Sequence, residues 1–240
     1  MRPAAWISGV GLALVAGCAP TTMSPMGLRM AMGPPDHVIK RAGLRSGPRL
    51  SAPLQAPDDF EGNSKPFASP QWSVAYDADV LIPVRGGTSV HLGFQGEVGC
   101  DESLDYCPLP VPGYGLSMGL SHYLDLGEFS IAPAVMLRGA TDFGIGTKGG
   151  PGSVVGAEAS VSVSVKLDET SAVGLVPFLG VHRVMLGDRD ISATYSGVAL
   201  AGHFDVGNGQ FLELTAGAGV VKMRGVPDWW APIFGLRGGP

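Results

Sequence analysis

The chain has 240 residues, which suits one domain of ordinary size, and its net charge of −5 comes without a basic patch, which argues against a nucleic-acid partner. Charged residues make up only 15%, and the 37 glycines are about twice the usual share. After the N-terminus, no stretch reaches the roughly 18–20 apolar residues that a membrane helix needs. An apolar chain without a membrane-spanning helix favours a membrane β-barrel, in whose strands apolar and polar residues alternate.

Residues 1–17 have the pattern of a secretory signal peptide, in which Arg2 precedes an apolar run over residues 4–16. The end of this segment and the residue after it, Val15-Ala16-Gly17-Cys18, resemble the lipobox of bacterial lipoproteins. The resemblance implies cleavage before Cys18, thioether lipidation of its sulfur and acylation of the new N-terminus. Ala19 stands where lipoproteins retained in the inner membrane often carry Asp, so the resemblance favours the outer membrane. An ordinary secretory signal that ends in a chance Cys is the alternative.

The mature chain, residues 18–240, is predicted to form one β-barrel domain that begins with a strand at residues 24–33. In that segment Met26, Leu28 and Met30 alternate with smaller or charged residues. Residues 34–70 show no periodicity and many prolines. They are expected to form a long extracellular loop, or a periplasmic linker if the barrel has eight strands and starts at residue 71.

Apolar and polar residues alternate strictly along most of the remaining chain, as in EASVSVSVKL at residues 158–167. The turn after residues 71–84 is short, so that strand should run toward the periplasm, and a strand at residues 24–33 must precede it. With a final strand at residues 229–238 the count is ten, an even number as in bacterial single-chain barrels, and an eight-strand barrel of residues 71–223 is the alternative. Residues 173–186 are apolar on both faces, so the pattern does not assign which of these side chains face lipid and which face the lumen. The further predicted strands are residues 71–84, 88–99, 113–124, 127–139, 152–167, 172–186, 190–206, 209–223 and 229–238.

The two faces of these strands indicate which side meets lipid. The polar faces carry mostly Gly, Ala and Ser, which suit the crowded inside of a narrow barrel, whereas the other faces carry aliphatics and aromatics such as Trp72, Phe94 and Phe129. The chain therefore resembles the small outer-membrane β-barrels of Gram-negative bacteria. The resemblance implies an all-β, antiparallel, up-and-down transmembrane barrel. A soluble, lipocalin-like lipoprotein that binds an apolar ligand would have its faces reversed and is kept as an alternative.

The connections alternate between short turns and longer links, as expected for periplasmic turns and extracellular loops. One longer link, CDESLDYC, contains Cys100 and Cys107. Exported chains meet an oxidising compartment, and the link is short enough for these two cysteines to pair, so a disulfide is predicted. A metal site is disfavoured because no His lies nearby.

Charged and histidine side chains recur on the polar faces. They are predicted to satisfy one another as a polar network in the lumen, because unpaired buried charges cost several kcal/mol. Catalysis is the alternative, but Ser121 and His122 are adjacent, point to opposite faces of a strand and cannot pair. The predicted network comprises Asp77, Asp79, His91, Glu97, Arg138, Glu158, Lys166, His203, Asp205 and Glu213.

These features predict a lipid-anchored outer-membrane barrel that is not an enzyme and that needs no cofactor or metal. It is expected to act as a structural or docking component of an envelope assembly through its extracellular loops. The expected partners are outer-membrane lipid and proteins of an envelope complex. The alternatives are a narrow channel or an outer-membrane enzyme.

Overall fold

The structure is a computed structural model that describes residues 43–51, 72–100, 113–142, 152–186, 189–223 and 226–239. In these ranges the chain forms ten long strands and one strand of two residues, β5, which follows β4 after a one-residue break. No helix long and apolar enough to cross a membrane occurs in the part of the chain that is described. The strands are β1 (Gly43–Ser51), β2 (Trp72–Arg85), β3 (Thr88–Cys100), β4 (Gly113–His122), β5 (Leu124–Asp125), β6 (Phe129–Asp142), β7 (Gly152–Lys166), β8 (Ala172–Leu186), β9 (Arg189–Gly207), β10 (Gln210–Met223) and β11 (Val226–Gly239).

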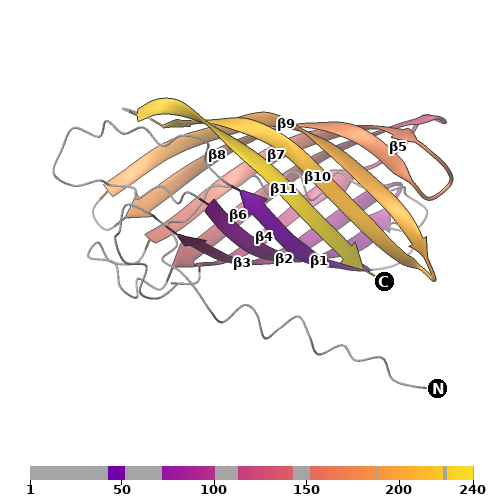
Figure 1. Cartoon of the computed structure of the whole chain (residues 1–240), viewed down its shortest axis with the longest axis horizontal. Helices are drawn as coiled ribbons and strands as arrows, with labels where there is room; N and C mark the ends of the chain where they lie inside the picture. The colour runs from indigo at the N-terminus through magenta and orange to yellow at the C-terminus, as the bar shows by residue number, and fades with distance from the viewer. Residues whose placement is uncertain are drawn as a thin grey trace, which may run out of the picture.

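The ten long strands form a closed, antiparallel, up-and-down barrel. Each pairs with the next along the chain, and β4 pairs with β6 across the short β5. The ring closes because β1 also pairs with β11, so that Ser46 lies opposite Gly238 and Leu50 opposite Phe234. Figure 1 shows the indigo β1 beside the yellow β11, with all strands tilted around one long wall. The predicted fold class and ten-strand count are confirmed, and the eight-strand alternative is excluded.

The position of the first strand differs from the prediction. The strand between β2 and β11 is β1, Gly43–Ser51, inside the segment that was expected to be a loop or linker. The segment predicted instead, residues 24–33, lies outside the described residues. Proline is rare in strands because it donates no ladder hydrogen bond, and Pro48 together with the polar Ser46 hid the alternation of β1.

Four short turns lie at one end of the barrel. Residues 85–88, 126–128, 167–171 and 207–209 connect successive strands there. At the first turn, Gly86 and Gly87 have φ of 58° and 82°, the left-handed values that a two-residue hairpin of type I′ requires. In the third turn, the backbone N–H of Thr170 donates to Asp168, and this hydrogen bond lowers the pKa of that exposed carboxyl group.

The start of β1 and the end of β11 lie at this same short-turn end. Gly43 is opposite Leu81, near the end of β2, and Gly239 is opposite Phe211, at the start of β10. The links at residues 101–112 and 143–151 join strands at the other end and lie outside the described residues. Barrels of the outer membrane have this arrangement, with short turns on the periplasmic side.

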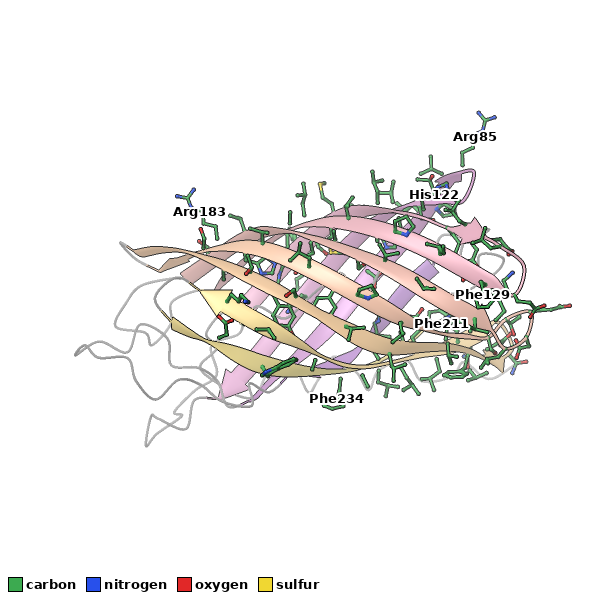
Figure 2. The ribbon with its side chains drawn as sticks, turned by 90° about the horizontal axis from the view of Figure 1, so that it is seen from above. Arg85, His122, Phe129, Arg183, Phe211 and Phe234 are labelled. Atoms are coloured by element: carbon green, nitrogen blue, oxygen red, sulfur yellow. The ribbon has the colours of Figure 1, made fainter. Side chains whose placement is uncertain are left out.

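The outer face of the barrel is apolar and the inner face is small or polar. Val161 and Val163 are exposed, whereas Ser162 between them is 1% exposed, and Glu213 is 1% exposed. In Figure 2, Phe234 points away from the wall, while Arg85 projects at the turn end and Arg183 toward the other end. A soluble barrel would bury the large apolar side chains and expose the polar ones. The orientation seen here is that of a barrel in lipid.

The inside of the barrel is filled by side chains. The rings of Phe178 and Tyr195 stack with centroids 5.2 Å apart. They fit because β9 and β10 carry glycine beside them: a Cβ at Gly219 would lie 2.8 Å from the Tyr195 ring, and one at Gly197 would lie 2.7 Å from the Phe178 ring. Burial also shows which face of β8 is which: Phe178 is buried in the lumen, whereas the next residue, Leu179, is exposed on the outer wall.

Candidate functional site in the barrel lumen

Buried charged and polar side chains line the lumen on several strands. Of the ten residues predicted for a lumen network, six are buried inside the barrel: Asp79, His91, Arg138, Glu158, His203 and Glu213. They come from β2, β3, β6, β7, β9 and β10, and they lie on inward positions because the strand alternation places the large aliphatics outside. Such groups are costly in a membrane-embedded interior unless they are paired.

A continuous line of polar contacts, which we call the polar belt, links six side chains across five pairs. Its residues are Ser121, His91, Asp79, Arg237, Glu213 and His203. At one end, Ser121 Oγ lies 2.7 Å from His91 Nε2, and His91 Nδ1 lies 3.9 Å from Asp79 Oδ2. In the middle, Arg237 donates to Asp79 Oδ1 over 3.2 Å and forms an ion pair with Glu213 Oε2 at 3.3 Å. At the other end, His203 Nδ1 lies 3.1 Å from Glu213 Oε1.

The charged groups of the polar belt are arranged around Arg237. This one guanidinium contacts two carboxylates, Asp79 and Glu213, and each carboxylate also has an imidazole as its neighbour. With both histidines neutral, the belt carries one net negative charge. A proton on either His91 or His203 would therefore neutralise the belt.

Two further pairs lie outside the polar belt. Arg138 on β6 donates to Gln95 Oε1 on β3 over 2.8 Å, so this contact passes over β4. On the neighbouring strands β7 and β8, Glu158 Oε1 lies 2.9 Å from His182 Nε2. Together with the stacked rings of Phe178 and Tyr195, these pairs fill the lumen on the side of β6 to β9.

Two predicted network residues lie elsewhere. Asp205 is exposed near the end of β9, where its side chain accepts a hydrogen bond from the backbone N–H of Gly207. Lys166 reaches the turn end, where its ammonium group lies 2.7 Å from Asp125 Oδ1. Both differ from the prediction because each lies at the turn end of its strand, where the polar side chain serves the turn instead of the lumen.

Several predicted sites lie outside the described residues. This applies to Cys18, to Cys107 and to the side chains of Asp77, Glu97 and Cys100. Lipidation of Cys18 and the Cys100–Cys107 disulfide therefore stay predictions. In the part of the chain that is described, no group of three or more His, Cys, Asp or Glu residues is placed to hold a metal ion.

Three important lumen residues were not predicted as part of the network: His182, Arg237 and Ser121. Arg237 sits near the end of the final strand, β11, where alternation is weak, and His182 sits in the segment that is apolar on both faces. Ser121 was examined only with His122, but His122 instead contacts Thr88 Oγ1 at 2.9 Å. The Ser121–His91 pair could have been found because the two residues stand on the polar, inward faces of two predicted strands that are neighbours in the barrel.

Comparison with known proteins places the fold only. No family model matches the chain, and no curated protein sequence matches it. Among solved structures, outer membrane phospholipase A from Escherichia coli is similar over 83% of this chain and 96% of its own, with 10% identity and a TM-score of 0.36. The outer membrane phospholipase of Salmonella typhi is similar over 82% of this chain and 90% of its own, with 10% identity and a TM-score of 0.34. The beta domain of the Bordetella autotransporter BrkA is similar over 82% of this chain and 99% of its own, with 12% identity and a TM-score of 0.39.

The prediction that the protein is not an enzyme is contradicted by these matches and is withdrawn. Two of the solved structures with a similar fold are phospholipases. At this level of similarity the comparisons assign no activity to the chain. Any chemistry must be argued from its own side chains.

Proposed function

We propose that the protein is an outer-membrane barrel, lipid-anchored at Cys18, that serves as a docking component of an envelope assembly through its loops. The single observation that carries the membrane part is the apolar outer wall around a polar, filled lumen. Large exposed aliphatics such as Leu116, Leu137 and Leu200 cover the outside, each between 59% and 68% exposed. In water such a surface would drive aggregation, whereas in lipid it is the expected surface.

The filled lumen supports a scaffold rather than an open pore. Tyr195, His91, Gln95 and Val176 are all 1% exposed or less. Ten strands enclose little space, since about eight strands are just filled by side chains. A rigid, plugged barrel is well suited to hold loops in fixed positions.

The docking part rests on where the irregular sequence lies. The links at residues 101–112 and 143–151 join strands at the end opposite the short turns. Recognition usually resides in loops on a rigid scaffold. Asp101, Glu102 and Asp105 would give the first link an acidic surface, and the predicted Cys100–Cys107 disulfide would constrain it. The partner we propose is a protein with a basic complementary surface.

The lipid anchor has a direct test. Replacing Cys18 by Ser should abolish incorporation of labelled palmitate, because the thiol that receives the lipid is gone. The barrel should still insert, since the apolar wall is unchanged. An unmodified mature N-terminus at another residue, found by mass spectrometry of the unaltered protein, would contradict the anchor.

The docking function is tested by exchanging residues 101–106 for a Gly/Ser segment of equal length. The barrel should keep its heat-modifiable migration in SDS, and crosslinking to its envelope partner should fall at least tenfold. A matched control exchanges Glu169 and Thr170 in the turn at the opposite end, which should leave crosslinking unchanged. Equal crosslinking by the loop variant and the unaltered protein would contradict docking through this loop.

A further inference from the structure

We propose that Ser121, His91 and Asp79 form a serine nucleophile site that cleaves carboxylic esters at the short-turn end of the lumen. The three residues come from adjacent strands, β4, β3 and β2, and face the same interior. A hydroxyl, an imidazole and a carboxylate in this order are what an activated serine requires: a base beside the nucleophile and an acid that orients the base. The proposal is independent of loop docking.

The contact between Ser121 and His91 has the geometry of a nucleophile and its base. Ser121 Oγ lies 2.7 Å from His91 Nε2, within the range for an O–H donor and an imidazole acceptor. When Nε2 accepts this hydrogen bond, the neutral ring carries its proton on Nδ1, the nitrogen that faces Asp79. The arrangement therefore selects the tautomer in which His91 can take the hydroxyl proton.

Asp79 acts as a positioning residue for His91. Its Oδ2 lies 3.9 Å from His91 Nδ1, an ion-pair separation that is longer than a hydrogen bond. The carboxylate is 2% exposed and is held from its other oxygen by Arg237. In such a poorly solvated place the charge of Asp79 acts strongly on the ring and favours the imidazolium that forms when His91 takes a proton.

The two other lumen histidines among the described residues lack this order. His182 and His203 each face a carboxylate, Glu158 and Glu213, but in the described part of the chain neither ring forms a hydrogen bond to a hydroxyl group. The buried Ser162 contacts another hydroxyl, that of Ser164, at 2.9 Å. Ser121 is therefore distinguished from an ordinary lumen serine by its base.

Access to the site is from the short-turn end. Ser121 is the second-last residue of β4, Gly113–His122, and it is only partly buried, whereas His91 is 1% exposed. The nucleophile thus lies closest to the barrel opening, and the base and the carboxylate lie deeper. This order suits a substrate that enters from that end and places its ester carbonyl at Ser121.

The proposed reaction balances without a cofactor. Ser121 Oγ attacks the ester carbonyl carbon as its proton passes to His91 Nε2. The carbon–alkoxy bond then breaks, and the leaving alcohol takes the proton from His91. A water molecule cleaves the resulting acyl-serine in the same two steps, which releases a carboxylic acid and restores the free hydroxyl.

The test uses a small fluorophosphonate probe on the folded, full-length protein in detergent. We expect the probe to label Ser121, identified by mass spectrometry. Ser121→Ala should abolish labelling, and His91→Gln should slow it by at least about 100-fold, because the base that takes the hydroxyl proton is gone. Ser162→Ala, the matched control for a buried lumen serine, should label at the unaltered rate.

Heat-modifiable migration in SDS shows whether each variant is folded. Should His91→Gln fail to fold, Ser121→Ala and Ser162→Ala still decide the question, since each removes one hydroxyl oxygen. The proposal is overturned if the folded, unaltered protein is not labelled at Ser121. It is also overturned if Ser162→Ala loses labelling as completely as Ser121→Ala does.

Discussion

Replacing Arg237 by Met should lower the free energy of unfolding by about 3–5 kcal/mol, the usual cost of leaving a buried charge without its partner. Arg237 is 6% exposed and lies between the carboxylates of Asp79 and Glu213, at 3.2 and 3.3 Å. Met preserves most of the side-chain volume but leaves two carboxylates close together in the lumen. The measurement is the urea dependence of unfolding in lipid vesicles, followed by the change from the folded to the unfolded migration in SDS.

The matched control is Lys222→Met on β10. Lys222 forms an ion pair of 3.0 Å with Asp228, but both side chains are at least 50% exposed. Surface pairs contribute about 0–1 kcal/mol, so this variant should remain near the unaltered protein. Adding Asp79→Asn and Glu213→Gln to Arg237→Met should recover most of the loss because no carboxylate of the polar belt is then left without its cation. An equal, small effect of Arg237→Met and Lys222→Met would show that the polar belt is not needed for stability.

Alternation predicted the barrel because lipid and lumen impose opposite demands on successive residues. Residues 158–167 contain only small or polar side chains at even positions, and the structure places Ser160 and Ser162 inside and Val161 and Val163 outside. Because side chains alternate with a period of two, assigning one residue to lipid or lumen assigns every other residue of the strand. The count of ten strands followed from the short turn after β2, which sets the direction of that strand and requires one strand before it and one at the end of the chain.

The first strand could not be located in the same way. In β1, Ser46 and Pro48 stand between Leu44 and Leu50 at alternate positions and break the run of large apolar residues. The position of this strand is instead determined by its two neighbours, since β2 and β11 leave one gap in the wall. Such a non-local constraint is not visible in the local pattern of residues.

The candidate site was only partly predictable for a related reason. The pattern shows which residues face the lumen, and it correctly placed Asp79, His91 and Glu213 on inward positions. It does not show which inward residues meet, because that depends on strand register and tilt around the ring. Ser121 meets His91 across one strand pair, and Arg237 reaches Asp79 across the closing strand β1. These contacts exist only after the barrel closes.

Replacing Leu179 by Arg should also destabilise the barrel strongly, by about 2–4 kcal/mol, the cost of an arginine on the lipid face at the bilayer midplane. Leu179 is the middle residue of β8, Ala172–Leu186, and its side chain is 52% exposed on the outer wall. Because the expected surroundings are hydrocarbon, the guanidinium would be taken out of water without a partner. Unfolding by urea in lipid vesicles measures the difference.

Leu167→Arg is the control that separates lipid from general exposure. Leu167 is the same residue type and is 57% exposed, but it lies just beyond the end of β7, in the short turn before β8. An arginine there can reach water and headgroups, so the expected cost is about 0–1 kcal/mol. A wall that faced water would tolerate both substitutions equally, because an exposed arginine costs little in water. Equal, small effects at Leu179 and Leu167 would therefore contradict a membrane-spanning barrel, whereas a large effect at Leu179 alone locates the hydrocarbon core at the middle of β8.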